Sequence, residues 1–413
     1  MNHSCKRHAF VLGALALLSS TGAKALEVQA GDWKFTANGN VNVHYIHSTC
    51  EQHPEAIVTV GGACSVDAGG EKNTSSVSNG LLPAALVFGV ATTQDGYDIT
   101  GTFGFYPGIS TNDGGSPNLQ QDGSALGTNV ALGTTGLDVR QVFMTFGNQD
   151  IGTFSLGRNF GLFGFDAIIN DMTLPGVGVG GAMSGGAPAN TSLGGIGFGY
   201  LYADTLAQMN YTTPSLLGGL TLTLGIFDPL EPLLQGPATA EGKPGFHGKL
   251  AYKLGDLYFS SSFITQTQHL PTGQDYTSSG FDVAAKAKFG PVDLLGSYYT
   301  GSGLGTTGLF VLSDDGFGNK RDSDGYLLQA TYTINKTKLG LNYGVSNLDF
   351  AGSADRAATP NLLSKNSKVT GGVYHSLTKN LTLLAEFSDV STKAHDGGKN
   401  TSNNFNVGAF LSF

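Results

Sequence analysis

Strict alternation of apolar and small polar residues recurs from one end of the chain to the other, and a period of two restricts such segments to β-strands. Residues 219–229, 279–289, 336–345, 380–388 and 404–413 all show it. Their polar positions hold mainly Gly, Ser, Thr and Asn, whereas the outer face of a β-sandwich is expected to be charged. Their apolar positions hold Leu, Val and Phe, and end in Tyr. One face for lipid and one for a watery lumen is the pattern of a transmembrane barrel.

Sixteen segments are predicted as strands, and the connections between them alternate between long and short. The predicted strands are 32–48, 79–92, 96–107, 136–147, 150–158, 195–212, 219–229, 246–254, 256–265, 279–289, 291–300, 325–334, 336–345, 366–376, 379–390 and 404–413. The predicted long loops are 49–78, 108–135, 159–194, 230–245, 266–278, 301–324, 346–365 and 391–403. An even number of antiparallel strands, with short turns at one rim and long loops at the other, is how outer-membrane barrels are built. Two further strands within the loops would make eighteen.

Composition agrees with an exported β protein. The chain has 62 glycines and only 13% charged residues, yet 10% of it is aromatic and 40% is hydrophobic. After residue 25 no run approaches eighteen consecutive apolar residues, which excludes a helical membrane protein. The formal net charge of −9 argues against a nucleic-acid partner, because such partners require basic patches. A secreted β-sandwich or adhesin stays as the alternative from a different class.

Residues 1–25 have the three parts of a secretory signal peptide. Lys6 and Arg7 are basic, residues 9–18 form an apolar stretch too short to span a bilayer, and the Ala-Lys-Ala at the end suits a cleavage site. We therefore predict that residues 26–413 form one mature domain. Removal of the peptide takes away cations and no acid, so the mature domain is more acidic than the full chain.

Two cysteines remain in the predicted mature chain, and two histidines lie near them. His47, Cys50, His53 and Cys64 have the ligand types of a zinc site. Exported chains fold in an oxidising compartment, however, where a pair of cysteines normally forms a disulfide. We predict a Cys50–Cys64 disulfide that staples the first long loop, with a metal site as the alternative.

Two further patterns bear on function, one on phosphate binding and one on hydrolysis, and the rest of the sequence supports neither activity. Gly176, Gly178 and Gly181 have the spacing of a phosphate-binding loop, but Pro175 precedes them and no helix is expected after them. A flexible glycine-rich loop is the preferred interpretation. No Ser, His and Asp group at a telling spacing, so we predict no catalytic residue and no cofactor. A hydrolase whose triad assembles only in space is the alternative.

The segment 139–172 carries the most specific motif of the chain. It reads Val-Arg-x-x-Phe from 139, then Asp-x-Gly-Thr-Phe-x-x-Gly-Arg-Asn-Phe-Gly from 150 to 161, and then holds Asp166 and the pair Asp171-Met172. This motif resembles the general diffusion porins of Gram-negative outer membranes, in which the fourth and fifth strands lead into the third loop. Weaker resemblance covers residues 39–45 and 211–219. The C-terminal strand ending in Phe413 resembles the signature that the barrel assembly machinery reads.

The resemblance implies an all-β, 16-stranded transmembrane antiparallel barrel whose third long loop folds into the lumen. It implies a water-filled channel for passive diffusion of small hydrophilic solutes and ions, with no enzymatic activity. The location would be the outer membrane of a Gram-negative bacterium. The expected partners are outer-membrane lipid and lipopolysaccharide, the barrel assembly machinery, and further copies of the chain in a homotrimer.

The resemblance also implies a pore constriction, where acids of the third loop face basic residues of the barrel wall. Asp166 and Asp171 would lie there with Arg140 and Arg158, and Asp171 would face Arg140. Opposed charges in a narrow gap create a transverse field that orients solutes and sets ion preference.

Other basic residues of the family's constriction have no counterpart in this sequence. Lys249 and Lys286, which alternation places toward the lumen, are predicted to replace them in part. Together with the negative net charge, the thin basic set leads us to expect a modest cation preference. A substrate-selective channel for small organic ions or acids is the alternative.

Overall fold

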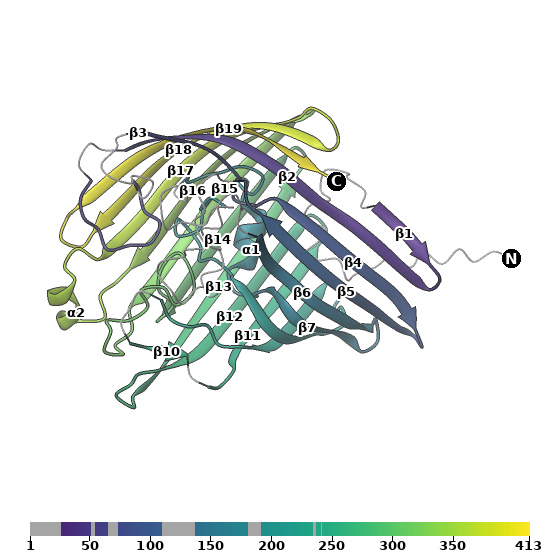
Figure 1. The fold of residues 1–413 in the computed structure, drawn as a ribbon, viewed down its shortest axis with the longest axis horizontal. Coiled ribbons are helices and arrows are strands. Elements are labelled where there is room, and N and C mark those ends of the chain that lie inside the picture. The colour runs from purple at the N-terminus through teal and green to yellow at the C-terminus, as the bar shows by residue number, and fades with distance from the viewer. Residues whose placement is uncertain are drawn as a thin grey trace.

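The computed structural model describes residues 26–50, 54–64, 73–109, 137–180, 191–233, 237–240 and 242–413. Sixteen long antiparallel strands follow one another around a closed barrel, from β2 (Trp33–Cys50) to β19 (Lys399–Ser412) (Figure 1). β19 pairs back with β2, from Ser402 opposite Cys50 to Ser412 opposite Asn40, and this pairing closes the sheet. The predicted all-β barrel of sixteen strands is confirmed.

The strands between these two follow in chain order. They are β4 (Ala85–Gln94), β5 (Tyr97–Pro107), β6 (Leu137–Asn148), β7 (Gly152–Phe160), β8 (Thr205–Thr212), β9 (Leu220–Phe227), β11 (Gly245–Leu254), β12 (Leu257–His269), β13 (Asp275–Phe289), β14 (Val292–Ser302), β15 (Asp322–Ile334), β16 (Thr337–Leu348), β17 (Leu363–Ser376) and β18 (Leu381–Ala394). Three short strands add to them, namely β1 (Leu26–Ala30), β3 (Asn73–Ser78) and β10 (Thr239–Ala240).

The described residues also contain two helices of six residues each, α1 (Phe165–Asn170) and α2 (Ser353–Ala358). Neither of these two helices is long or apolar enough to cross a membrane. The predicted signal peptide, residues 1–25, lies outside the described residues and stays a prediction.

The outward face of the barrel is a belt of apolar side chains. On β19, Phe405, Val407 and Leu411 are exposed, while Asn404 and Asn406 are buried on the inner face. The same alternation recurs on the other strands, as their burial patterns show. Large apolar side chains in this position suit a lipid environment, and the polar inner face suits a lumen.

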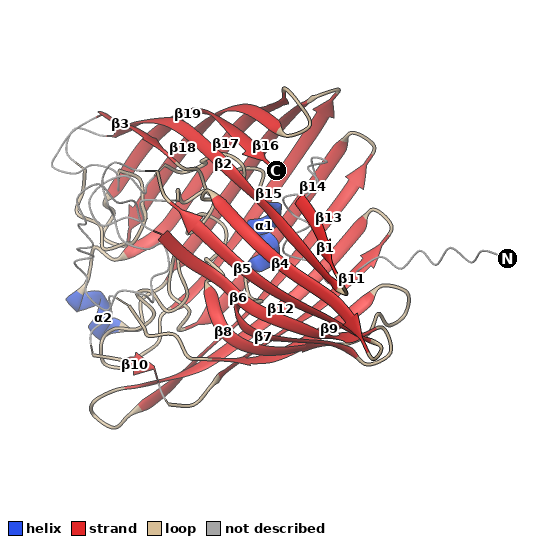
Figure 2. Ribbon diagram, turned by 45° about the vertical axis from the view of Figure 1, so that its right-hand side comes forward, coloured by secondary structure: helices blue, strands red, loops and turns tan. Residues whose placement is uncertain are grey.

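Short turns join the strands at one end of the barrel, called here the turn rim, and longer loops join them at the other end, the loop rim (Figure 2). Between β4 and β5 the turn is Asp95-Gly96, and both residues have positive φ, as the tightest hairpin turns require. The C-terminus lies at the turn rim, where Phe413 and Gly39 exchange two backbone hydrogen bonds of 3.0 Å.

The prediction of a strand over 79–92 is wrong in its first part. β4 begins at Ala85, and β3 supplies the partner for the other half of β2. Residues 79–84, called here the wall break, leave the sheet and turn toward the interior, where the Asn42 amide donates to the Leu82 carbonyl at 2.9 Å. Pro83 has no N–H to give to a ladder, which is a physical reason for the interruption.

Three predicted loop boundaries also need correction. The predicted long loops 266–278 and 391–403 are short, because β12 and β13, like β18 and β19, extend far past the apolar belt. In the other direction, the predicted strand 195–212 begins only at Thr205. The strand extensions pair polar residues, with the Thr267 and Thr277 hydroxyls 3.0 Å apart, so they lack the alternation that marks a strand in lipid.

The predicted disulfide is confirmed, since Cys50 at the end of β2 is bonded to Cys64 in the first loop. The link fixes residues 54–64 beside the end of the barrel, where the Ala63 N–H donates to the Thr392 hydroxyl at 2.7 Å. His53, the fourth member of the alternative metal site, lies outside the described residues.

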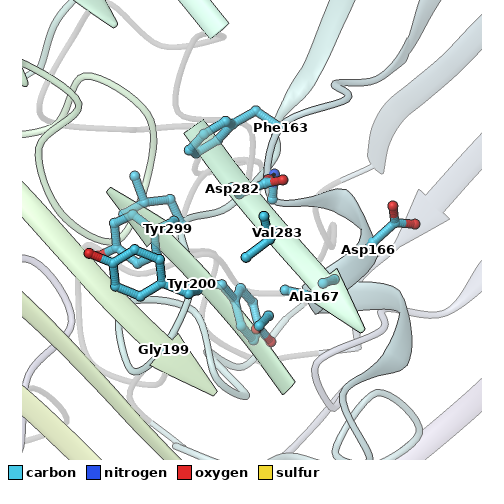
Figure 3. A pocket seen from close by; sticks show the side chains of 13 residues that line it. Phe163, Asp166, Ala167, Gly199, Tyr200, Asp282, Val283 and Tyr299 are labelled. Carbon is cyan, nitrogen blue, oxygen red and sulfur yellow. Dashed lines mark hydrogen bonds between the residues drawn. The ribbon is translucent and has the colours of Figure 1, made fainter. Parts of the chain in front are cut away.

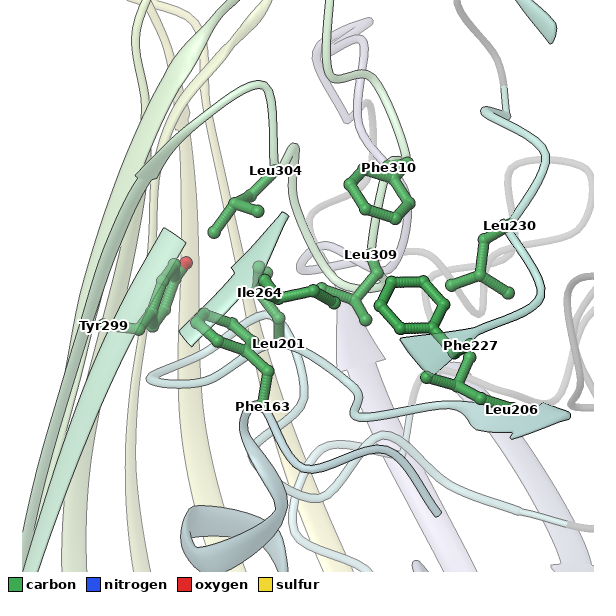
Figure 4. Close-up of a cluster of buried hydrophobic side chains, with 10 residues drawn as sticks. All are labelled: Phe163, Leu201, Leu206, Phe227, Leu230, Ile264, Tyr299, Leu304, Leu309 and Phe310. Atoms are coloured by element: carbon green, nitrogen blue, oxygen red, sulfur yellow. The ribbon is translucent and has the colours of Figure 1, made fainter. Parts of the chain in front are cut away.

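Segments at the loop rim pack into a hydrophobic core inside the barrel (Figure 4). The core joins the third loop to the loop between β14 and β15 and to the inner face of the wall. Its members are Phe163, Leu201, Leu206, Phe227, Leu230, Ile264, Tyr299, Leu304, Leu309 and Phe310, all buried. This packing fixes one end of the third loop and so positions the site described next.

Candidate constriction site

The third long loop, residues 161–204 and called here the inner loop, runs through the interior of the barrel. Figures 1 and 2 show α1, which belongs to it, surrounded by the strands. The inner loop leaves the wall after β7 and returns at β8, and several of its hydrogen bonds reach the opposite wall, from β13 to β19. The predicted fold of the third loop into the lumen is therefore confirmed.

The first turn of the inner loop is fixed to β13 and its neighbours by carboxylates. The Gly164 N–H donates to Asp282 Oδ2 at 2.5 Å. Figure 3 shows Asp282 beside Phe163 at a small cavity, while the Asp166 side chain points away from it. Asp166 Oδ2 accepts from the Tyr258 hydroxyl at 3.0 Å and lies 3.3 Å from Lys249 Nζ. Asp166 and Lys249, two predicted site residues, thus form an ion pair.

Asp171 lies at the end of α1 and is buried against the wall rather than exposed to the lumen. Its Oδ1 accepts from the Asn342 amide at 3.0 Å, and its Oδ2 accepts from the Tyr200 hydroxyl at 2.8 Å. Lys368 Nζ lies 3.9 Å from Oδ2. Burial, and secondly the Asp171 carboxylate, raise the pKa of the Tyr200 hydroxyl well above its usual value. Asp171 therefore holds the two arms of the inner loop together and to β16.

Glu386 on β18 anchors the inner loop to the far wall. One of its carboxylate oxygens, Oε2, accepts from the N–H groups of Val177 and Gly178, both at 2.8 Å. The other, Oε1, accepts from the Tyr374 hydroxyl at 2.6 Å. The glycine spacing that resembles a phosphate-binding loop thus presents its N–H groups to a carboxylate of the same chain. On the neighbouring β17, buried Lys368 donates to the Gly194 carbonyl at 2.9 Å.

The wall break holds the inner loop from another side. The Leu81 N–H donates to the Gly176 carbonyl at 2.7 Å, and the Leu82 N–H donates to the Leu174 carbonyl at 3.2 Å. Backbone groups that the break removes from the barrel ladder are therefore satisfied by the inner loop. Gly80 and Pro83, in an otherwise apolar segment, are the residues from which this interruption could have been predicted.

Arg140 does not meet Asp171, contrary to the pairing expected from the resemblance. Arg140 Nε donates to Asp138 Oδ2 at 2.7 Å, and its guanidinium lies over the Tyr106 ring. Arg158 donates to the Val139 carbonyl at 3.2 Å and to the Thr205 hydroxyl at 2.9 Å. Both arginines stand on β6 and β7, the side that the inner loop leaves, whereas Asp171 is bonded to the opposite wall.

A cavity of about 520 Å³ lies below the inner loop, toward the turn rim. Its lining contains four lysines, which are Lys286, Lys288, Lys336 and Lys338, and two acids, Asp171 and Asp293. Lys286 Nζ donates to the Asn170 side chain of the inner loop at 3.0 Å. Lys338 Nζ lies 4.8 Å from the centre of the Tyr374 ring. Of these four lysines only Lys286 was predicted as a site residue, although alternation also places Lys288 and Lys338 on the inner face.

A closed barrel with an apolar belt, an inward loop and a charged cavity below that loop defines a membrane pore. The sequence model of the Gram-negative porins matches residues 12–395, and the chain belongs to this family. It is an outer-membrane channel for the passive diffusion of small solutes, as the resemblance implied, and a channel rather than an enzyme.

Several solved structures share the fold. The outer membrane channel DcaP of Acinetobacter baumannii has a TM-score of 0.67 at 15% identity, over 95% of this chain and 100% of that one. The anion-selective porin from Comamonas acidovorans has a TM-score of 0.62 at 16% identity, over 92% of this chain and 100% of that one. OmpT of Vibrio cholerae, in its trimer form, has a TM-score of 0.50 at 13% identity, over 92% of this chain and 99% of that one. A comparison with curated proteins gives no match. Identities this low show the fold alone.

Proposed function

We propose that this porin favours small anions, and that the lysine-lined cavity below the inner loop is where the preference arises. The observation that carries the proposal is the excess of lysines over acids in the cavity lining. Asp171 is the one inner-loop acid in that lining, and Asn342, Tyr200 and Lys368 surround its carboxylate. Asp166 is paired with Lys249.

The negative net charge of the whole chain favours cations. Many of the acids lie far from the cavity, however, so their effect on its potential is weaker than that of the lysines that line it. Many acids lie at the loop rim, such as Asp314, Asp315, Asp349 and Asp396. A strand of twelve residues, the length of β16, rises roughly 40 Å. At physiological ionic strength the Debye length is about 8 Å, and the potential of an exposed charge is largely screened beyond that distance. Charges at the loop rim therefore contribute little to the field in a cavity at the turn rim, and the local lysines decide its sign.

In planar bilayers with a KCl gradient, the reversal potential is expected to indicate chloride preference. The double substitution Lys288→Gln and Lys336→Gln should move it toward the cation side, because both side chains line the cavity and are exposed. Lys379→Gln is the matched control, since this exposed lysine sits in a turn outside the lining. A wild-type channel that prefers potassium would exclude the proposal.

We further propose a role in shaping the constriction for the four residues that the resemblance indicated. Asp166 and Asp171 would position the inner loop, and Arg140 and Arg158 would stabilise the wall at its base. This assignment is supported by the bonds given above, in which each group has partners in the wall or the loop. Lys249 would act through Asp166, and Lys286 through Asn170 as well as by its charge.

The assembly is proposed to be a homotrimer in outer-membrane lipid and lipopolysaccharide, inserted by the barrel assembly machinery through the strand ending at Phe413. The proposal is supported by family membership and by the structural likeness to OmpT in its trimer form. The mature chain would start at Leu26. Native mass spectrometry of the detergent-extracted protein is expected to give the mass of three mature chains, and a monomer alone would count against this assembly.

A further inference from the structure

We infer that the cavity below the inner loop is a binding site for organic carboxylates with an apolar body, preferred over hydrophilic anions of the same charge. The inference rests on the proposed anion preference and adds a substrate class to it. Its basis is that the cavity has two unlike sides, one cationic and one apolar. A site of this kind recognises a molecule that has the same two parts.

The cationic side is formed by neighbouring strands of the barrel wall. β13 supplies Lys286 and Lys288, and Lys336 and Lys338 stand in the turn before β16 and in β16 itself. In the sheet register Lys288 is opposite Asp293, so one acid offsets part of this charge. The remaining lysines leave the side cationic, and hydroxyl groups of Thr331, Thr333, Ser376 and Thr382 lie among them.

Two of these lysines are held in place rather than free to follow any passing ion. The Lys286 ammonium is bonded to Asn170 of the inner loop at 3.0 Å. The Lys338 ammonium lies 4.8 Å from the Tyr374 ring centre, within the range of a cation–π contact. Ammonium groups positioned in advance lose less conformational freedom when an anion binds, which favours a binding site over a diffuse positive potential.

The apolar side is formed by the inner loop and by the wall on which it rests. Its members are Leu82, Ile169, Met172, Leu174, Pro175 and Phe410. Leu82 packs against the cluster of Tyr374, Leu384 and Phe410, and the Tyr374 ring contacts the Lys338 ammonium. The apolar and cationic sides therefore meet at Tyr374, within the span of one small molecule.

The volume and the chemistry of the cavity define the ligand class. About 520 Å³ is within the range of small-molecule sites, and such sites combine an apolar lining with few polar groups. Chloride gains from the lysines but leaves the apolar side in contact with water. A polyhydroxylated carboxylate gains the same charge contact and would lose hydrogen bonds to water against the apolar side. A carboxylate with a hydrocarbon body satisfies both sides.

Hexanoate and gluconate provide the direct test, because both are monoanions with six carbons and differ in their hydroxyl groups. Each is added to both sides of a bilayer containing the full mature channel in KCl at neutral pH. Hexanoate is expected to reduce the chloride current in a saturable way, with a half-blocking concentration about tenfold below that of gluconate, which corresponds to about 1.4 kcal/mol.

Two variants locate the effect within the cavity. Leu174→Ser should remove the difference between hexanoate and gluconate, because it places a hydroxyl on the apolar side of the cavity. Leu377→Ser is the control, an exposed leucine in a turn outside the lining. If Leu174→Ser does not give a folded, heat-modifiable barrel, Ile169→Ser replaces it at the same side of the cavity.

The outcomes separate this inference from the proposed function. Equal block by both anions, in a channel that prefers chloride over potassium, would overturn the binding site and leave the anion preference standing. A channel that prefers potassium would overturn both. The site would also be overturned if hexanoate blocked the Leu174→Ser and Ile169→Ser channels as strongly as the wild type. The apolar side would then play no part in binding.

Discussion

Replacement of Glu386 by alanine is expected to release the inner loop from the far wall and to make the channel current larger and noisier. The carboxylate accepts three hydrogen bonds, from the N–H groups of Val177 and Gly178 and from the Tyr374 hydroxyl. Alanine leaves all three donors without this acceptor and removes the negative charge near buried Lys368. Among the wall carboxylates described above, Glu386 accepts from two consecutive N–H groups of the inner loop.

The size of the effect follows from the burial of these groups. Removal of one member of a buried charged cluster costs about 3–5 kcal/mol, because the remaining groups keep the cost of their desolvation. A loss of that size changes the ratio of docked to released loop by roughly two to four orders of magnitude. The loop ends are covalently fixed at β7 and β8 and its core packing remains, so we expect fluctuation of its middle part rather than loss of the barrel.

Single-channel recording and limited proteolysis measure this release. The inner loop contains no Lys or Arg but several Phe and Tyr, so chymotrypsin is the suitable protease. Faster cleavage within residues 161–204 is expected for Glu386→Ala. Glu386→Gln keeps an oxygen for the two N–H groups and should lie close to wild type. Asp389→Ala, at an exposed acid on the same strand, is the matched control. An unchanged current and cleavage rate in folded Glu386→Ala would contradict the anchoring role.

Much of the barrel could be predicted from the sequence, because lipid imposes a simple rule on each strand. Residues such as Phe405 and Val407 must face outward and Asn406 inward, and a period of two follows. The rule does not apply to residues that lie beyond the apolar belt. The polar extensions around Thr267 and Thr277 are strands without the pattern, and the wall break carries apolar residues without being a strand.

The candidate site was less predictable, because its geometry depends on contacts between residues far apart in the chain. Asp171 was found from its motif, but its partners Asn342 and Lys368 lie more than 170 positions later, and no spacing reveals them. The cation preference was inferred from the net charge, which sums over the whole chain. Lys288 and Lys338 stand on the inner face of their strands and line the cavity, so the local charge there differs in sign from the net charge.

The most local test of the inner loop's position is Gly344→Ala, which adds one methyl group to the inner face of β16. A β-carbon at Gly344 would overlap the carbonyl oxygen of Phe198 in the inner loop. Gly344 has no positive φ, so its backbone accepts alanine and the main obstacle is the overlap with the Phe198 carbonyl group. Overpacking of this kind typically costs about 1–3 kcal/mol, and here the neighbour is backbone, which has little freedom to move.

We expect Gly344→Ala to push the inner loop off β16 between Phe198 and Tyr200. The bond from the Gly199 N–H to the Ser346 hydroxyl, 2.9 Å long, would break, and Tyr200 would move away from Asp171. Chymotrypsin should then cleave near these aromatic residues many times faster than in wild type. The barrel should keep its heat-modifiable migration, because the strand ladder is untouched.

Gly371→Ala provides the control for this substitution on the neighbouring strand. Gly371 is opposite Leu341 of β16, and a β-carbon there meets nothing within 4 Å. Alanine at this position is expected to leave cleavage and conductance as in wild type, and to stabilise the strand slightly by restricting the unfolded chain. Equal cleavage of the two variants would mean that the inner loop does not rest on β16 in the membrane. Fast cleavage of Gly344→Ala, with Gly371→Ala cleaved as slowly as wild type, would show that the inner loop rests on β16.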